Sequence, residues 1–197
     1  GGSAIDLAKG ISALYNREEN SRYTPDMLTP LIKAKRYSKA MEQIDIIAVP
    51  TTSGTGSEVT QWATIWDEGR EAKYSIDAPF LKPKLALVVP ELTASMPAVM
   101  TVSTGLDAMC QAIEAYWSKH TNPVVQELAY RAVELAIENL RSAVDTPDDL
   151  NVREKLCRAS VLAGLAFSQT RTTACHSISY PLTMLYNIPH GLAASIT

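Results

Sequence analysis

The 197-residue chain lacks the sequence features of disulfide-rich, membrane-spanning, secreted and nucleic-acid-binding proteins. Its three cysteines, an odd number with no CxxC pair, do not make a disulfide framework, so we expect a reducing, cytoplasmic setting. No run reaches the roughly 18 apolar residues of a membrane span, and the first residues lack the pattern of a signal peptide. The net charge of -3 makes nucleic acid and anionic lipid unlikely partners.

The hydrophobic content, 46%, is enough to bury a core of one domain or two small ones. Residues 44–49 and 85–89 form short apolar runs that end at prolines, and these predict buried strands. Beyond residue 104 apolar residues recur at helical spacing, which predicts helices over 108–117, 124–144 and 152–167. The sequence therefore predicts an α/β part followed by an all-α part.

The chain begins inside a glycine turn and ends inside an apolar run. Gly1 opens inside a glycine turn, and Ile196 and Thr197 stop inside an apolar run with no helix-ending signal. We therefore expect the sequence to be a central piece of a longer protein.

The glycine turn of Gly1, Gly2 and Ser3 precedes a segment, 4–15, whose apolar residues have helical spacing. Free N–H groups and the positive end of the helix dipole suit the pyrophosphate of a dinucleotide. An ordinary turn or an engineered linker would look the same, and this motif alone does not decide between them.

A second candidate contact is the loop over 51–57, which contains only small residues and follows a predicted strand. Its hydroxyls and backbone amides can approach a phosphate or ribose at the carboxyl edge of a sheet. A solvated turn is the alternative interpretation.

Four side chains in the helical part have the chemistry of a metal site. Asp107 and Gln111 are four apart, on one face of a predicted helix, and His176 and His190 follow downstream. Imidazoles and a carboxylate suit zinc or iron(II), whereas the amide oxygen of Gln111 is a weak ligand. We exclude His120, which has the setting of a solvated helix end; hydrogen-bonded core histidines are the alternative for the other two.

Together these motifs resemble the iron-containing alcohol dehydrogenase family. The resemblance rests on the ordered stretches 1–9, 49–58 and 104–108, on His176, and on Pro189-His190-Gly191. It implies a dehydroquinate synthase-like architecture, with residues 1–92 from the α/β dinucleotide-binding domain and 93–197 from the helical metal-binding domain. The active site would lie in the cleft between these two domains.

The resemblance also implies the ligands. The cofactor would be NAD or NADP, and the metal a divalent ion, with iron(II) favoured over zinc. Asp107, Gln111, His176 and His190 would hold the metal, and the enzyme would be a homodimer or larger homo-oligomer. The implied cofactor contacts are Gly1, Gly2, Ser3, Asp6, Thr51, Thr52, Thr55 and Lys73.

Two residues, Gln111 and Tyr180, depart from the family pattern. The family usually has a histidine at the first position and often has one at the second. Both departures, with the stretches 60–66 and 171–181, are similar to the phosphonoacetaldehyde reductase branch. Arg171 could bind an anionic substrate group through two hydrogen bonds, although a surface salt bridge or helix cap would explain it equally well.

The resulting functional hypothesis is reduction of a short aldehyde by a reduced nicotinamide, with phosphonoacetaldehyde to 2-hydroxyethylphosphonate as the leading case. The metal would act as a Lewis acid, and the product proton would come from water or through Tyr180. Two alternatives stay open: a dehydrogenase of an uncharged alcohol or diol, and a metal-free nucleotide-binding relative without activity.

Overall fold

The computed structural model describes residues 1–14, 25–39, 44–67, 69 and 72–197. The first half contains two helices, α1 (Gly2–Leu14) and α2 (Pro25–Lys33), and two small sheets. In one sheet β1 (Ile47–Ala48) and β4 (Leu85–Ala86) run parallel, with Ile47 opposite Leu85. In the other, β2 (Trp62–Asp67) and β3 (Ala72–Asp77) pair antiparallel.

All the long elements of the second half are α-helices. Asn122 caps α4 by accepting a 3.0 Å hydrogen bond from the amide of Val125, and Asp149 caps α5 by accepting one of 2.9 Å from the amide of Asn151. The helices are α3 (Ala98–Trp117), α4 (Pro123–Asp145), α5 (Leu150–Thr170), α6 (Ala174–Tyr186) and α7 (His190–Ser195). Short 3₁₀ turns occupy Arg36–Lys39, Ser57–Val59, Pro79–Leu81 and Pro90–Thr93.

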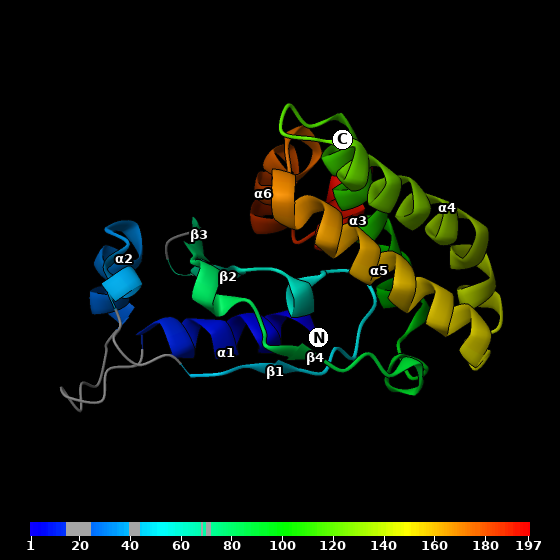
Figure 1. Ribbon diagram of the computed structural model, residues 1–197, viewed down its shortest axis with the longest axis horizontal. Helices are drawn as coiled ribbons and strands as arrows, with labels where there is room; N and C mark the ends of the chain where they lie inside the picture. The colour runs from blue at the N-terminus through cyan, green and yellow to red at the C-terminus, as the bar shows by residue number, and fades with distance from the viewer. Residues whose placement is uncertain (15–24, 40–43, 68, 70–71) are drawn as a thin grey trace.

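The helical core consists mainly of alanines. Helices α3, α4 and α5 lie side by side in Figure 1, and small side chains let their backbones approach closely. Phe167 stacks on Trp62 of β2, with 5.5 Å between ring centroids, and so joins this core to the α/β half. The buried residues of the cluster are Ala108, Ala112, Ala115, Val125, Ala129, Ala132, Ala163, Ala166 and Phe167.

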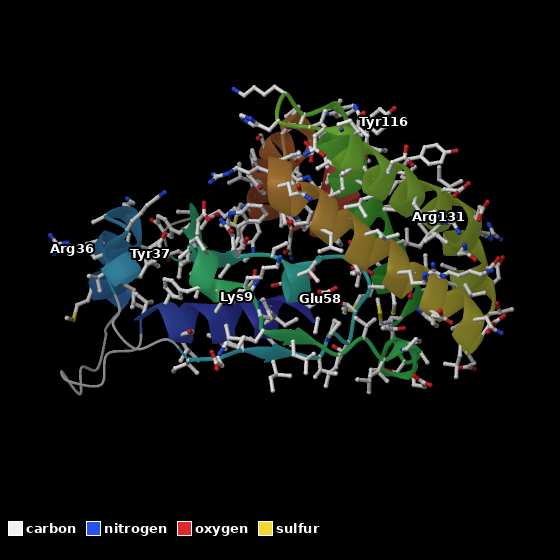
Figure 2. All side chains as sticks on the ribbon, in the orientation of Figure 1. Lys9, Arg36, Tyr37, Glu58, Tyr116 and Arg131 are labelled. Atoms are coloured by element: carbon white, nitrogen blue, oxygen red, sulfur yellow. The ribbon has the colours of Figure 1, made fainter. Side chains whose placement is uncertain are left out.

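A buried lysine fixes α1 to the segment before β2. The Lys9 ammonium donates to the carbonyl oxygens of Ser57, Thr60 and Trp62 at 2.7, 2.9 and 2.8 Å, and it lies near both threonine and serine hydroxyls. Figure 2 shows Lys9 with Glu58 between α1 and the helical half, whereas Arg131 projects from α4. Burial lowers the pKa of Lys9 to about 8, although Asp6 and Glu58 oppose that shift.

One glycine sets how closely the two halves meet. Gly56 has a φ of 59°, in the left-handed region that favours glycine, and a Cβ there would lie 2.7 Å from the Cα of Gly164 on α5. The loop over 51–57 therefore packs directly on the helical half, which brings it toward α3.

Each helix and strand predicted from the sequence has a counterpart in the structure. The helices over 108–117, 124–144 and 152–167 lie within α3, α4 and α5. The helix over 4–15 lies within α1 apart from residue 15, which is outside the described residues. The strands over 44–49 and 85–89 are paired only at 47–48 and 85–86. Sequence reasoning missed α2 and the β2–β3 hairpin, and the domain division at residue 92 stays a prediction.

Among the helices that the structure describes, none combines the length and apolar character that crossing a membrane requires.

Candidate active site

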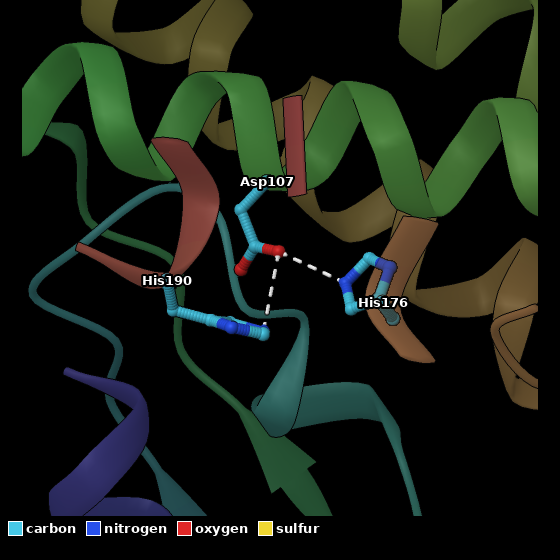
Figure 3. Close-up of side chains that lie close together, drawn as sticks. All are labelled: Asp107, His176 and His190. Carbon is cyan, nitrogen blue, oxygen red and sulfur yellow. Dashed lines mark hydrogen bonds and ion pairs between the residues drawn. The ribbon is translucent and has the colours of Figure 1, made fainter. Parts of the chain in front are cut away.

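Three predicted metal ligands meet where α3, α6 and α7 come together. Asp107 lies on α3, His176 on α6 and His190 at the start of α7, and Figure 3 shows their side chains converging. One ligand atom from each lies within 4.8 Å of the others, and the two imidazole centroids are 5.3 Å apart. Asp107 and His176 are buried, while His190 is half-buried.

The spacing of these atoms fits a divalent ion. His176 Nε2 is 3.1 Å and His190 Nε2 is 4.0 Å from Asp107 Oδ1. Ligand atoms around a tetrahedral zinc, each about 2.1 Å from the ion, are separated by roughly 3.4 Å. A carboxylate and two imidazoles also match the ligand preferences of zinc and iron(II). The donor set and its geometry therefore suit a metal, although the ion itself remains a proposal.

Gln111 lies one turn beyond Asp107 on α3 and is buried. Its Oε1 atom has no hydrogen-bond partner in the described part of the chain. A buried amide oxygen without a partner costs about 1–3 kcal/mol. A metal ion or a hydrogen-bond donor that bound this oxygen would relieve the cost. This is the behaviour expected of a weak, neutral fourth ligand, and that role stays a prediction.

Glu114, which sequence reasoning missed, orients His176. Its fully buried carboxylate pairs with His176 Nδ1 and accepts hydrogen bonds of 2.9 Å from both the amide and the hydroxyl of Thr173. A carboxylate on the far nitrogen of a metal-binding histidine fixes the ring and its tautomer. The available signal was spacing, because Glu114 lies seven residues after Asp107 and so shares its helix face.

The carboxylates also control the charge of His176. Burial lowers the pKa of this imidazole, but the hydrogen bonds to Asp107 and Glu114 outweigh that effect and raise it to about 9. Burial lowers the pKa of His190, and the charges of His176 and Lys73 lower it further against the influence of Asp107. Metal binding would therefore displace a proton from His176, while His190 is ready as a neutral ligand.

The position of His190 depends on the glycine that follows it. A Cβ on Gly191 would lie 1.8 Å from the backbone oxygen of Ser103 and 2.9 Å from the Cβ of Asp107. Only glycine therefore allows α7 to lie this close to α3. Tyr180 stacks on the His190 ring, with centroids 5.8 Å apart and planes 12° apart, and so restricts its rotation.

Lys73 lies beside this stack. It is opposite Trp66 in the β2–β3 hairpin, and its ammonium is 3.3 Å from the centre of the Tyr180 ring and 5.9 Å from that of Trp66. Burial lowers the pKa of Lys73 to about 8, against the influence of Asp6 and Asp107. Burial also raises the pKa of Tyr180, although a hydrogen bond with Thr172 opposes the shift, so the phenol stays protonated.

The glycine turn was predicted to precede the first helix, but Gly2 and Ser3 are already the first residues of α1. The structure brings this end of α1 and the threonine loop together. The Gly1 nitrogen donates to Thr51 Oγ1 at 2.8 Å, and Cβ atoms built on Gly1 and Gly2 would lie 2.8 and 2.6 Å from atoms of Thr52 and Thr55. The two segments are thus in direct contact, and their shared role in cofactor binding stays a prediction. Ser3, next to them in α1, is exposed.

Asp6 and Arg171 are both held by other groups of the chain. Asp6 accepts hydrogen bonds from Ser57 Oγ at 2.5 Å and from the amide of Thr64 at 2.9 Å. Arg171 forms a 2.6 Å ion pair with Asp77 of β3, and its side chain is 69% exposed. Each therefore has a structural role, and the cofactor role of Asp6 and the substrate role of Arg171 stay predictions.

Comparisons with known proteins agree with the order of these motifs. Residues 1–90 match the family described as iron-containing alcohol dehydrogenase, and residues 101–197 match the C-terminal part of the same family. The chain belongs to the iron-containing alcohol dehydrogenase family. The resemblance on which the sequence analysis relied is thereby confirmed.

Individual proteins are similar over nearly the whole chain. A phosphonoacetaldehyde reductase of Streptomyces viridochromogenes is 39% identical over 100% of this chain and 49% of its own length. A choline dehydrogenase of Bacillus subtilis is 36% identical over 97% of this chain and 46% of its own length. The crystal structure of sulfoacetaldehyde reductase from Bifidobacterium kashiwanohense in complex with NAD+ has a TM-score of 0.84 and 38% identity, covering 98% of this chain and 50% of that one.

These relatives confirm the expected fold class, an α/β part followed by an all-α part with the architecture of this family. The chain spans about half the length of the curated relatives it matches.

Proposed function

We propose that the protein carrying this chain reduces short aldehydes to alcohols, using NADH or NADPH and a divalent metal, and catalyses the reverse oxidation. The observation that carries the proposal is the convergence of Asp107, His176 and His190, each with one ligand atom within 4.8 Å of the others. The relatives support the reaction class, because they include an NADPH-dependent butanol dehydrogenase of Clostridium saccharobutylicum and an NAD-dependent methanol dehydrogenase of Bacillus methanolicus.

The residues of the chain supply a rigid frame for this chemistry. Asp107, His176 and His190 would hold the metal, iron(II) in first place and zinc in second, with Gln111 as a neutral fourth donor. A bound ion would supply Lewis-acid polarisation of the carbonyl oxygen, and a reduced nicotinamide would supply the hydride. Glu114 and Tyr180 keep the two imidazoles in place, which limits the reorganisation that catalysis requires.

The cofactor groove is proposed where the glycine turn and the threonine loop are in contact. Gly1 and Gly2 stand at the N-terminal end of α1, where backbone N–H groups and the helix dipole favour a pyrophosphate. Thr51, Thr52 and Thr55 face that turn across the contacts described above. Because the loop also packs on α3, a dinucleotide bound here would extend toward Asp107.

Tyr180 is the protein group that we propose as a source of the product proton. The Tyr180 phenol stays protonated because burial raises its pKa, and its ring stacks on His190. It can donate a hydrogen bond toward an oxygen at the metal site, and water is the other source.

Among substrates, we favour a short aldehyde with an anionic group, and phosphonoacetaldehyde to 2-hydroxyethylphosphonate as the specific reaction. Two relatives support that choice, since one is named a phosphonoacetaldehyde reductase and another a sulfoacetaldehyde reductase. Uncharged alcohols are the alternative, which the 1,3-propanediol dehydrogenase of Klebsiella pneumoniae supports.

Metal content and cofactor oxidation test the proposal together. The protein is loaded with iron(II) or zinc, its metal content is measured, and NADH and NADPH oxidation is followed with a panel of short aldehydes. His190→Ala should lose both the metal and the activity, whereas His120→Ala, a change at an exposed histidine, should keep both. Full activity of His190→Ala, or of metal-free protein, would refute the metal-dependent reaction.

A further inference from the structure

Arg171 has a backbone conformation that residues with a side chain rarely adopt. It follows the last residue of α5 with φ 69° and ψ 168°, in a region that is almost limited to glycine because a Cβ is crowded there. Asn187, which follows α6, also has a positive φ, but its φ of 55° and ψ of 28° are those of an ordinary helix end. A strained conformation such as that of Arg171 persists only where surrounding contacts enforce it.

The side chain of Arg171 provides such contacts. Its guanidinium pairs with Asp77 Oδ2 at 2.6 Å, and although the arginine side chain is 69% exposed, that of Asp77 is only 14% exposed. The other oxygen of Asp77 accepts a 2.8 Å hydrogen bond from Gln61, so the carboxylate is fixed in advance. The guanidinium also lies 6.0 Å from the ring centre of Trp62, which stacks on Phe167, one turn before Arg171 on α5. Contacts from the α/β half therefore hold a residue of the helical half.

The strained turn leads directly to the contacts of Thr173, two residues further on. Both the amide and the hydroxyl of Thr173 donate to Glu114 at 2.9 Å, and the indole N–H of Trp117 donates to the same hydroxyl at 3.0 Å. Because an indole N–H is only a donor, the hydroxyl oxygen accepts from Trp117 and its hydrogen is directed at Glu114. Glu114 also accepts from the amide of His176 at 3.4 Å and pairs with its ring. The direction in which the chain leaves α5 therefore decides whether Thr173 and His176 reach this carboxylate.

We propose that Arg171 is a positioning residue for the metal ligand His176. Its ion pair with Asp77 holds the chain between α5 and α6 in the strained conformation, and this conformation directs the start of α6 toward Glu114. Because Asp77 belongs to the β2–β3 hairpin, the pair also joins the half that would bind the cofactor to a ligand of the metal. The inference rests on the proposed metal-dependent function, and it gives Arg171 a role that needs no contact with the substrate.

The test compares substitutions, made in the full-length protein, that separate the ion pair from the strain. Arg171→Ala loses the pair but keeps a Cβ in the strained region, so the turn should relax and zinc affinity should fall roughly 10-fold or more. Arg171→Gly also loses the pair but adopts the same φ and ψ without strain, so the affinity should fall less than about threefold. Arg171→Lys keeps the charge and should recover part of the loss. Competition with a calibrated chelator measures each affinity.

Asp77→Asn removes the other member of the pair and should match Arg171→Ala, and the double variant should bind zinc no more weakly than either single variant. Arg141→Ala is the matched control, because Arg141 forms an exposed ion pair with Asp145 at 2.7 Å, and it should leave zinc affinity unchanged. Equal affinities of Arg171→Ala and the wild type, or equal losses in Arg171→Ala and Arg171→Gly, would refute the inference. A loss confined to kcat/KM for phosphonoacetaldehyde, with butanal and zinc affinity unchanged, would overturn it in favour of a substrate contact.

Amide hydrogen exchange separates this inference from the proposed function, because it needs no metal. Glu114 accepts from the amides of Thr173 and His176, so in the metal-free protein Arg171→Ala should speed the exchange of both amides roughly 10-fold or more. Arg141→Ala should leave their exchange unchanged. If the wild type binds no metal, the proposed function fails, but the exchange still tests the positioning role. Unchanged exchange in Arg171→Ala would refute that role.

Discussion

At the scale of single residues, Glu114 controls how His176 faces the proposed metal. Its carboxylate pairs with the Nδ1 atom of the ring and also accepts hydrogen bonds from Thr173. Burial raises the pKa of Glu114, but the hydrogen bonds from His176 and Thr173 outweigh that effect and hold it below its usual value. The carboxylate therefore stays charged and keeps the His176 Nε2 atom directed at Asp107.

Glu114→Gln should weaken metal binding about 10- to 100-fold, because an amide of the same size supplies neither the charge nor two acceptor oxygens. Competition with a calibrated chelator measures the affinity. Glu138→Gln, a change at an exposed position on α4, should leave it unchanged. An unaltered affinity in Glu114→Gln would show that the ring keeps its orientation without this carboxylate.

Gln111 offers a change in the opposite direction. Its buried Oε1 has no partner within the described residues, and the family usually has an imidazole at this position. Gln111→His should tighten binding of zinc or iron(II) by about tenfold or more, because imidazole is the better ligand for both. The same chelator competition checks this, and weaker binding would mean that the position does not reach the metal.

At the scale of elements, the site depends on how closely α7 approaches α3. His190 opens α7, and Gly191 provides the space for that helix to lie beside Ser103 and Asp107. The helix has only six residues, so its position depends on this packing rather than on its own stability. Displacement of α7 would separate His190 from the other two ligands.

Gly191→Ala should therefore abolish metal binding and lower the free energy of unfolding by about 1–3 kcal/mol through overpacking. Metal analysis and denaturant unfolding measure the two effects. Gly10→Ala on α1 is the matched control, since a Cβ there would lie at an ordinary 3.6 Å from Ile65. It should stabilise the protein by about 0.5–1 kcal/mol because alanine favours a helix. Normal metal binding by Gly191→Ala would contradict the packing argument.

At the scale of the whole molecule, Lys9 links α1 to the segment that leads into the β2–β3 hairpin. That hairpin carries Trp66 and Lys73, so the link helps to position these two side chains next to Tyr180. The ammonium donates to backbone carbonyl oxygens of three residues that are 48 to 53 positions away in the chain. Without it, those carbonyls would lose their donor inside the protein.

Lys9→Met should lower the free energy of unfolding by about 3–5 kcal/mol, as removal of one member of a buried charged network typically does. Urea unfolding monitored by circular dichroism measures the change. Lys82→Met, at an exposed lysine outside this network, should cost less than about 1 kcal/mol. Similar stability of Lys9→Met and the wild type would show that water replaces the ammonium.

The pH dependence of stability should carry the signature of Lys9. Its pKa is about 8 in the folded protein, below the ordinary 10.5 that applies when it is unfolded. Between these values the unfolded chain binds more protons, so the Lys9 contribution makes stability rise with pH from about 8 to about 10.5, and below pH 8 it is constant. The full rise is about 3 kcal/mol. Lys9→Met should show a correspondingly flatter profile over this window, and parallel profiles would refute the shift.

The sequence by itself determined the family, the order of the two parts and the long helices, because helical periodicity and glycine turns are local patterns. It also indicated Asp107, Gln111, His176 and His190 as candidate metal ligands, through the helical spacing of the first two and the resemblance of the surrounding motifs to the family. Glu114 was accessible in principle through its spacing from Asp107. The β2–β3 hairpin was not, because its strands are short and mix polar with apolar residues.

Only the tertiary structure decided which charged groups meet. Arg171 pairs with Asp77, 94 positions away, and this contact could not be inferred from either local sequence. Lys73 faces Tyr180 because the hairpin extends toward α6, and Lys9 is buried because the segment from Ser57 to Trp62 folds over α1. A charge takes its role from the oxygens, carboxylates and rings that surround it, and these are brought together by packing between distant segments rather than by neighbours in the chain.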